Sequence, residues 1–156
     1  MTALVFVPLD REAAYALRAG SDQGPRPGCA ATAGLAASAG SDAVTEEVEF
    51  AALNHAGVLA LIGAADPLRL VLAADVEAGQ LKDSGDGLGQ VVVTGLRWPQ
   101  VQSLFADDPD AAAAVGRARA VTEGLTLAEA LDRPEVADLL DGYDLLWFAP
   151  EELDRC

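Results

Sequence analysis

The run Leu68-Arg69-Leu70-Val71-Leu72-Ala73-Ala74-Asp75-Val76 decides the fold, because it is an almost continuous apolar segment. A strand with one face in water alternates apolar and polar residues, whereas a strand covered on both faces does not. The run therefore predicts an interior strand with packed layers on both sides. Aromatic residues make up only 5% of the chain, so alanine, valine and leucine must build the core.

The residues before this strand predict a long buried helix from Thr45 to about Ala64. Thr45 can cap the first turn, and Glu46, Glu47 and Glu49 follow where the positive end of the helix dipole favours anions. Apolar residues then occupy nearly every side of the helix, which is typical of a helix that is covered all round.

The residues after the strand predict two further strands. Glu77–Gly89 is a polar connecting segment. We expect Gln90–Arg97, which follows it, to pair antiparallel with the strand Leu68–Val76. Trp98–Ala106 fits both a strand and a helix, and the alternation of its apolar and polar residues after Val101 favours the strand.

The N-terminal part predicts a strand over Leu4–Pro8 and a short helix over Arg11–Ala19. Residues 21–44 are rich in glycine, alanine and proline, and Pro25 and Pro27 interrupt any regular element there. We expect an irregular connection in which only Thr32–Ala39 could hold a turn or two of helix.

The C-terminal third predicts helices and a last strand. Asp108-Pro109 begins a helix over Ala111–Val121, Thr126–Glu129 matches a capping box, and a further helix ends near Leu140. Tyr143–Phe148 is the last strand, and its apolar run predicts that its tryptophan lies in the core.

This order of elements predicts one α+β domain over residues 1–156. Adjacent strands between helices favour a single layer of mixed or mostly antiparallel sheet, with four to five strands, packed against helices.

The charge of the chain excludes some partners. Its 25 carboxylates against 10 lysines and arginines give a formal net charge of −15, which repels nucleic-acid phosphates and anionic membranes. A basic partner protein is compatible with this charge. The two cysteines, Cys29 and Cys156, and the lack of an export signal or apolar span predict a cytoplasmic protein.

Five residues are candidates for a binding site. His55 is the only histidine and thus the natural general base near neutral pH. Arg97 and Trp98 follow a predicted strand, and Asp107 and Asp108 precede a predicted helix. The usual hydrolase, nucleotide and zinc motifs are absent from the sequence, so we predict no catalytic set, metal site or cofactor.

Several stretches together resemble a family of small uncharacterised actinobacterial proteins, a domain of unknown function. The resemblance rests on Val5–Pro8, Glu46–Leu53, Leu70–Val76, the Asp107-Asp108 step and Asp144–Ala149. It implies one domain and a strand over Val101–Phe105. Trp98-Pro99 and the glycine-rich middle depart from the family pattern, and the resemblance implies no activity, cofactor or catalytic residue.

Three functional hypotheses follow from the sequence. The leading one is a non-catalytic module that binds a protein or regulatory partner, because a catalytic constellation is missing and the surface is strongly charged. The alternative is a small enzyme or ligand-binding protein in which His55, Arg97 and a carboxylate such as Asp107 meet in one cleft. In the third, the acidic surface mimics nucleic acid.

Overall fold

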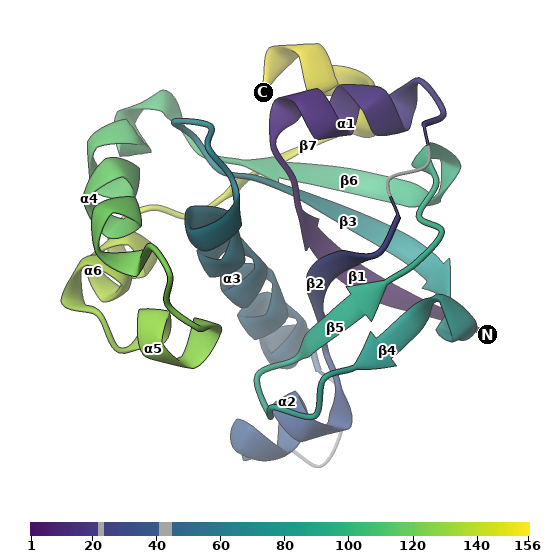
Figure 1. Cartoon of the computed structure of the whole chain (residues 1–156), viewed down its shortest axis with the longest axis horizontal. Helices are drawn as coiled ribbons and strands as arrows, with labels where there is room; N and C mark the ends of the chain where they lie inside the picture. The colour runs from purple at the N-terminus through teal and green to yellow at the C-terminus, as the bar shows by residue number, and fades with distance from the viewer. Residues whose placement is uncertain (22–23, 41–44) are drawn as a thin grey trace.

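A computed structural model of the chain describes residues 1–21, 24–40 and 45–156. Helices pack on an antiparallel sheet of seven strands in the order β4-β5-β2-β1-β3-β6-β7 (Figure 1). The predicted α+β class is confirmed, but the predicted number of four to five strands is wrong. The strands are β1 Thr2–Pro8, β2 Arg26–Ala30, β3 Leu70–Glu77, β4 Leu81–Asp83, β5 Gln90–Val93, β6 Val101–Ala106 and β7 Leu146–Phe148.

Strand β3 lies inside the sheet, as its apolar sequence predicts. It pairs with β1 from Thr2↔Glu77 to Pro8↔Val71, and with β6 on its other side. Leu70 to Ala74 are all buried, because one face of the sheet packs on one hydrophobic cluster and the opposite face on another. Of the strand predicted for Trp98–Ala106, residues Val101–Ala106 are confirmed as β6, whereas Trp98–Gln100 form a 3₁₀ turn.

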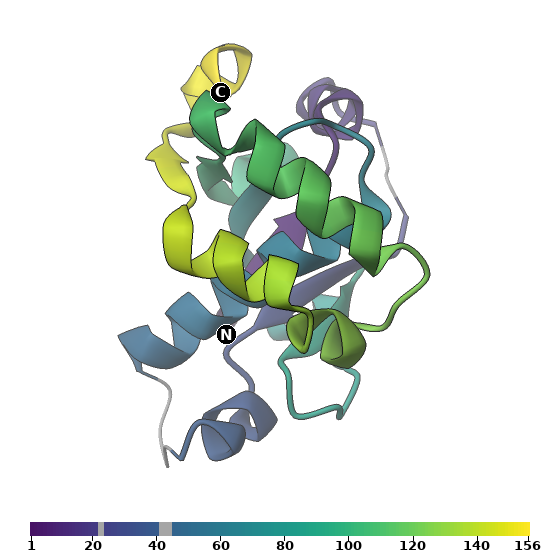
Figure 2. The ribbon, with the colours of Figure 1, turned by 90° about the vertical axis from the view of Figure 1, so that its left-hand side faces the viewer.

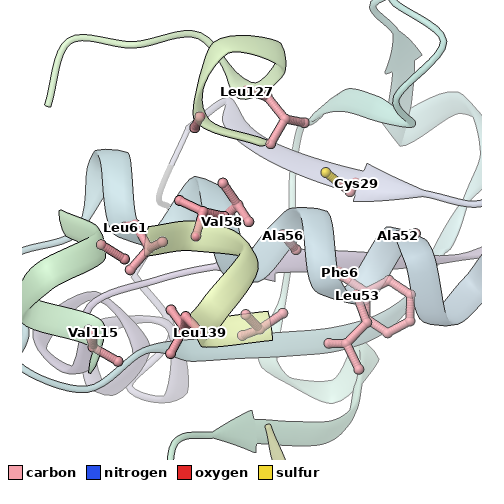
Figure 3. Packing of buried hydrophobic residues seen from close by; sticks show 14 of the residues in the cluster. Phe6, Cys29, Ala52, Leu53, Ala56, Val58, Leu61, Val115, Leu127 and Leu139 are labelled. Carbon is pink, nitrogen blue, oxygen red and sulfur yellow. The ribbon is translucent and has the colours of Figure 1, made fainter. Parts of the chain in front are cut away.

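Helix α3, Glu46–Gly63, is the central helix that its sequence predicts. Thr45 caps it, since its hydroxyl accepts a hydrogen bond from the Val48 amide at 3.4 Å. One side of α3 packs on the sheet and the other on further helices, so it is apolar nearly all round (Figures 1 and 3). The other helices of this face are α2 Ala33–Ser38, α4 Ala112–Thr122, α5 Leu127–Leu131 and α6 Pro134–Gly142.

The opposite face of the sheet is covered by α1, Arg11–Arg18, and by the C-terminal 3₁₀ helix Pro150–Arg155 (Figure 1). Leu17 and Leu153 from these two elements are buried in the same cluster as Val5 and Val7 of β1. Helices therefore flank the sheet on both sides, and α1 and α3 lie on opposite faces.

The first missed strand is β2, which lies in the segment that the prolines led us to read as irregular. Pro27 pairs only with Val92 of β5, whereas the β1 ladder reaches just Cys29 and Ala30. A proline has no backbone N–H to donate, so a strand tolerates it where a partner strand is paired on one side only. Of the same segment, residues 22–23 and 41–44 lie outside the part that the structure describes.

The predicted antiparallel pairing of Gln90–Arg97 with Leu68–Val76 is wrong. Strand β5 pairs instead with β2 on one side and with β4, the second missed strand, on the other. The polar connecting segment Glu77–Gly89 therefore does not connect two neighbouring strands. It holds β4, which turns back onto β5 from Leu81↔Val93 to Asp83↔Val91.

Candidate functional site

The structure does not bring His55 and Arg97 together. His55 lies on α3, half-buried, with its Nδ1 atom 2.8 Å from the carbonyl oxygen of Leu88. A carbonyl oxygen only accepts, so Nδ1 carries the proton and Nε2 is the acceptor of the neutral ring. Arg97 follows β5, and its neighbour Trp98 packs on the cluster beneath α1. The sheet thus separates the histidine from the arginine.

Asp107 is engaged in a buried ion pair with Arg69. Its Oδ2 accepts hydrogen bonds from the backbone amide of Arg69 at 2.8 Å and from Nε at 2.9 Å, and its Oδ1 accepts one from Nη2 at 2.8 Å. The side chains of Arg69 and Asp107 are 1% and 0% exposed. The pair joins β3 to the end of β6, so Asp107 has a structural role and presents no surface to a ligand.

Asp108 begins the next helical segment. Its Oδ1 accepts a hydrogen bond from the amide of Asp110 at 2.9 Å, where the 3₁₀ turn Pro109–Ala111 leads into α4. This is the helix start that Asp108-Pro109 predicts. Its carboxylate therefore stabilises the turn.

Arg97 and Trp98 line a groove of about 600 Å³ between the end of α1 and the loop after β5. Leu17 and Arg18 of α1 form the opposite wall. Two of the five candidates, Arg97 and Trp98, thus line one concave surface together.

Strand β7 forms an open edge of the sheet. It is last in the strand order and pairs with β6 alone, from Leu104↔Phe148 to Ala106↔Leu146. An edge strand presents backbone N–H and C=O groups that no neighbouring strand satisfies. Figure 2 shows β7 in yellow at the margin of the molecule, between α6 and the C-terminal 3₁₀ helix.

Exposed apolar side chains gather on this edge, which we call the β7 edge. The predicted core position of Trp147 is wrong, because the residue is 62% exposed. Trp147 pairs with Phe105, but no strand lies beyond it to cover the indole. Of the seven exposed large hydrophobic residues among those described, three fall within a span of five residues: Tyr143, Leu146 and Trp147.

Carboxylates flank the β7 edge on both sides in the sequence. Between Arg133 and Arg155 the chain holds seven carboxylates and no lysine or arginine. Asp141 and Asp144 precede the strand and Glu151 follows it, and all three are exposed. Sequence analysis missed this site, although the short apolar run between acidic residues is the signal that marks it.

Cys29 is not a nucleophile. Its side chain is buried on β2 against α3 (Figure 3), and burial raises the pKa of its thiol to about 12. A thiol with this pKa is protonated at neutral pH and does not react as a thiolate. Within the described ranges, no group of three or more His, Cys, Asp or Glu side chains is gathered as a metal ion would need.

In the described part of the chain, none of the helices combines the length and the apolar character needed to cross a bilayer. No curated protein and no solved structure matches the chain. A family model does match, over residues 3–156, and its description is "Family of unknown function (DUF6912)". Because the match covers nearly the whole sequence, the chain belongs to this family of unknown function.

Proposed function

We propose that this protein is a non-catalytic module that binds a basic partner protein along the β7 edge. The observation that carries the proposal is the exposed Trp147 on an open edge strand, with carboxylates on both sides of it in the chain. An enzyme that joins His55 to Arg97 has no support in this geometry, since the sheet lies between them.

The open edge suits a partner in extended conformation. A segment added beside β7 would satisfy its outward N–H and C=O groups, as peptides do when they extend a sheet. Because successive side chains of a strand point to opposite faces, apolar residues of the partner would contact Trp147 or Leu146, and neighbouring lysines or arginines would face the carboxylates. A second copy of this chain is a poor occupant, since its net charge of −15 would repel the first.

Trp147 sets the scale of the binding energy. A tryptophan side chain buries roughly 150–250 Å² when fully covered. Covering the 62% that is exposed would remove about 120 Å² from water, or about 3 kcal/mol at ~25 cal/mol per Å². Immobilisation of the partner offsets part of this gain, so truncating Trp147 should weaken binding by at least about tenfold.

The test uses an acetylated and amidated octapeptide of alternating lysine and valine. The chain has two tryptophans, so in a Trp98→Phe background the emission of Trp147 reports binding alone. We expect saturable binding that weakens as salt rises and that protects the amides of residues 146–148 from hydrogen exchange. An octapeptide of alternating glutamate and valine, and the lysine peptide N-methylated at every residue, should bind at least tenfold more weakly.

Calorimetry of variants tests whether the peptide binds along the β7 edge. Trp147→Ser should weaken binding of the lysine peptide. Phe50→Ser, which changes a residue 52% exposed on α3, should leave this binding unchanged. Equal binding of the N-methylated peptide, or no effect of Trp147→Ser, would overturn the proposal. If neutralising Asp141 and Asp144 weakens binding while Trp147→Ser does not, the acidic surface acts alone, as in nucleic-acid mimicry.

The proposal places the protein and its partner in the cytoplasm. Cys29 and Cys156 are both free thiols, and free thiols persist in a reducing compartment.

A further inference from the structure

The groove beside Trp98 is a second surface with its own chemistry, on the face of the sheet opposite α3. Its volume of about 600 Å³ falls within the roughly 300–1,000 Å³ of small-molecule sites. Leu17 and Leu96 contribute to its walls, and Trp98 and Pro99 form one side. The groove therefore offers an apolar bed with a tryptophan ring for a flat ligand.

Two glycines form the turns that border the groove. Gly20 ends α1 with a φ of +92°, and Gly95 turns the chain after β5 with a φ of +66°. Both line the groove, and both backbones adopt a left-handed conformation that side chains disfavour. The two turns thus bring the end of α1 and the loop after β5 to the groove.

The charge of the groove is opposite to that of the molecule as a whole. Arg18 and Arg97 both line it, and no carboxylate is found among the described residues that do so. Arg18 is fixed in place, since it pairs with Asp154 at 3.3 Å and lies 5.0 Å above the ring of Tyr15. The Arg97 guanidinium forms no salt bridge with any residue in the described ranges, so its charge is not neutralised there.

We infer that this groove binds a small organic anion with a flat apolar body, such as an aromatic carboxylate or sulfonate. The body would pack on Trp98 and Leu96, and the anionic group would pair with Arg97. Guanidinium groups bind planar anions through paired N–H donors, which makes arginine the favoured residue for this contact. Polyanions would be repelled by the net charge of −15, which leaves small ligands as the class that can reach the arginine.

The test uses two fluorescent probes that differ by one charged group. 1-Anilinonaphthalene-8-sulfonate has a sulfonate, and N-phenyl-1-naphthylamine is the same aromatic body without it. In a Trp147→Phe background Trp98 is the remaining tryptophan, so quenching of its emission reports that a probe binds, and the Arg97→Gln variant tests whether it binds in the groove. We expect the sulfonate to bind at least about fivefold more tightly than the neutral probe, and salt to reduce this preference.

Arg97→Gln is the decisive variant. The backbone amide of Arg97, which donates to Gln100 at 3.0 Å, stays in place, so the loop keeps its shape. The variant should lower the affinity for the sulfonate about fivefold or more and leave the affinity for the neutral probe unchanged. Arg117→Gln, which removes an exposed arginine on α4, should change neither probe.

Three results with the bound probes would overturn the inference: equal affinity for both probes, equal effects of Arg97→Gln and Arg117→Gln, or sulfonate binding without quenching of Trp98. Failure here differs from failure at the β7 edge. The Trp147→Phe background alters that edge and not the groove, whereas Arg97→Gln should leave lysine-peptide binding unchanged. If a peptide with an acidic C-terminus quenches Trp98 and both probes fail to, the groove is a peptide site and the small-anion inference is wrong.

Discussion

The substitution Asp107→Asn tests how much of the fold depends on the buried pair with Arg69. The carboxylate accepts three hydrogen bonds from this one residue, and the amide of Asp107 donates back to the Arg69 carbonyl at 3.3 Å. Asparagine keeps the shape of the side chain but removes its charge and replaces one acceptor oxygen with an NH₂ group. That group would face the Nη2 donor of Arg69, and two donors repel.

The expected cost is large because the guanidinium cannot reach water. Arg69 is 1% exposed, so the variant leaves an uncompensated cation in the interior. Removing one partner of a buried pair costs about 3–5 kcal/mol. Since domains of this kind are stable by about 5–15 kcal/mol, Asp107→Asn should lose a major part of its unfolding free energy.

Urea unfolding, followed by far-UV circular dichroism, measures this loss. Asp108→Asn is the matched control, because it changes the neighbouring carboxylate and asparagine caps a helical turn about as well as aspartate does. The control should stay within about 0.5 kcal/mol of the wild type. The double variant Arg69→Met with Asp107→Leu should be more stable than Asp107→Asn, since it removes the buried charge altogether.

A loss below about 1 kcal/mol for Asp107→Asn would refute the argument from burial. So would a double variant that is less stable than Asp107→Asn, because the cost would then lie in the packing of the site and not in an unpaired charge.

Three further predictions concern glycine and thiol positions. Gly116→Ala on α4 should raise the unfolding free energy by about 1 kcal/mol, because no heavy atom outside the helix's own backbone lies within 4 Å of the added Cβ. Gly57→Ala should lower the unfolding free energy, because its Cβ would lie 3.0 Å from Nη1 of the fixed Arg69. Thermal melts that rank the two variants in the reverse order would contradict this reasoning. Native protein should show one thiol open to Ellman's reagent, the half-buried Cys156, and a second after unfolding in urea. The pKa of Cys29 rises on folding from 9.0 to about 12, so its contribution to stability is complete below pH 9 and is lost as pH rises from 9 to 12. At pH 10 this loss should be about 1 kcal/mol relative to Cys29→Ala, and identical pH profiles for the two proteins would show that burial does not hold the thiol protonated.

Local patterns in the sequence predict the helices well, because helix ends are built from neighbouring residues. The Asp10 carboxylate accepts a hydrogen bond from the amide of Ala13 at 2.8 Å, and α1 begins at Arg11, as predicted. Thr126 and Glu129 form the predicted capping box, with the amide of each donating to the other side chain at 3.0 and 3.2 Å. The apolar run of β3 likewise predicts burial on both faces, since a strand with polar residues on one side could not be covered there.

The partners of the strands and charges depend on residues far apart in the sequence, and there the sequence was insufficient. Pro25 and Pro27 disfavour a strand over residues 26–30, but pairing with β1 and β5 stabilises β2 there. Arg69 forms its ion pair with Asp107, which lies 38 residues further along the chain. The apolar run around Trp147 is compatible both with a strand that another strand covers and with an edge strand, so it does not predict the exposure of the indole. Sequence alone determined which segments are helical and which strand is central, because those preferences act between neighbours and through hydrophobic patterning. Only the tertiary structure decided that β7 is an edge and that Arg97 and Trp98 line a groove, because exposure depends on which other parts of the chain pack nearby.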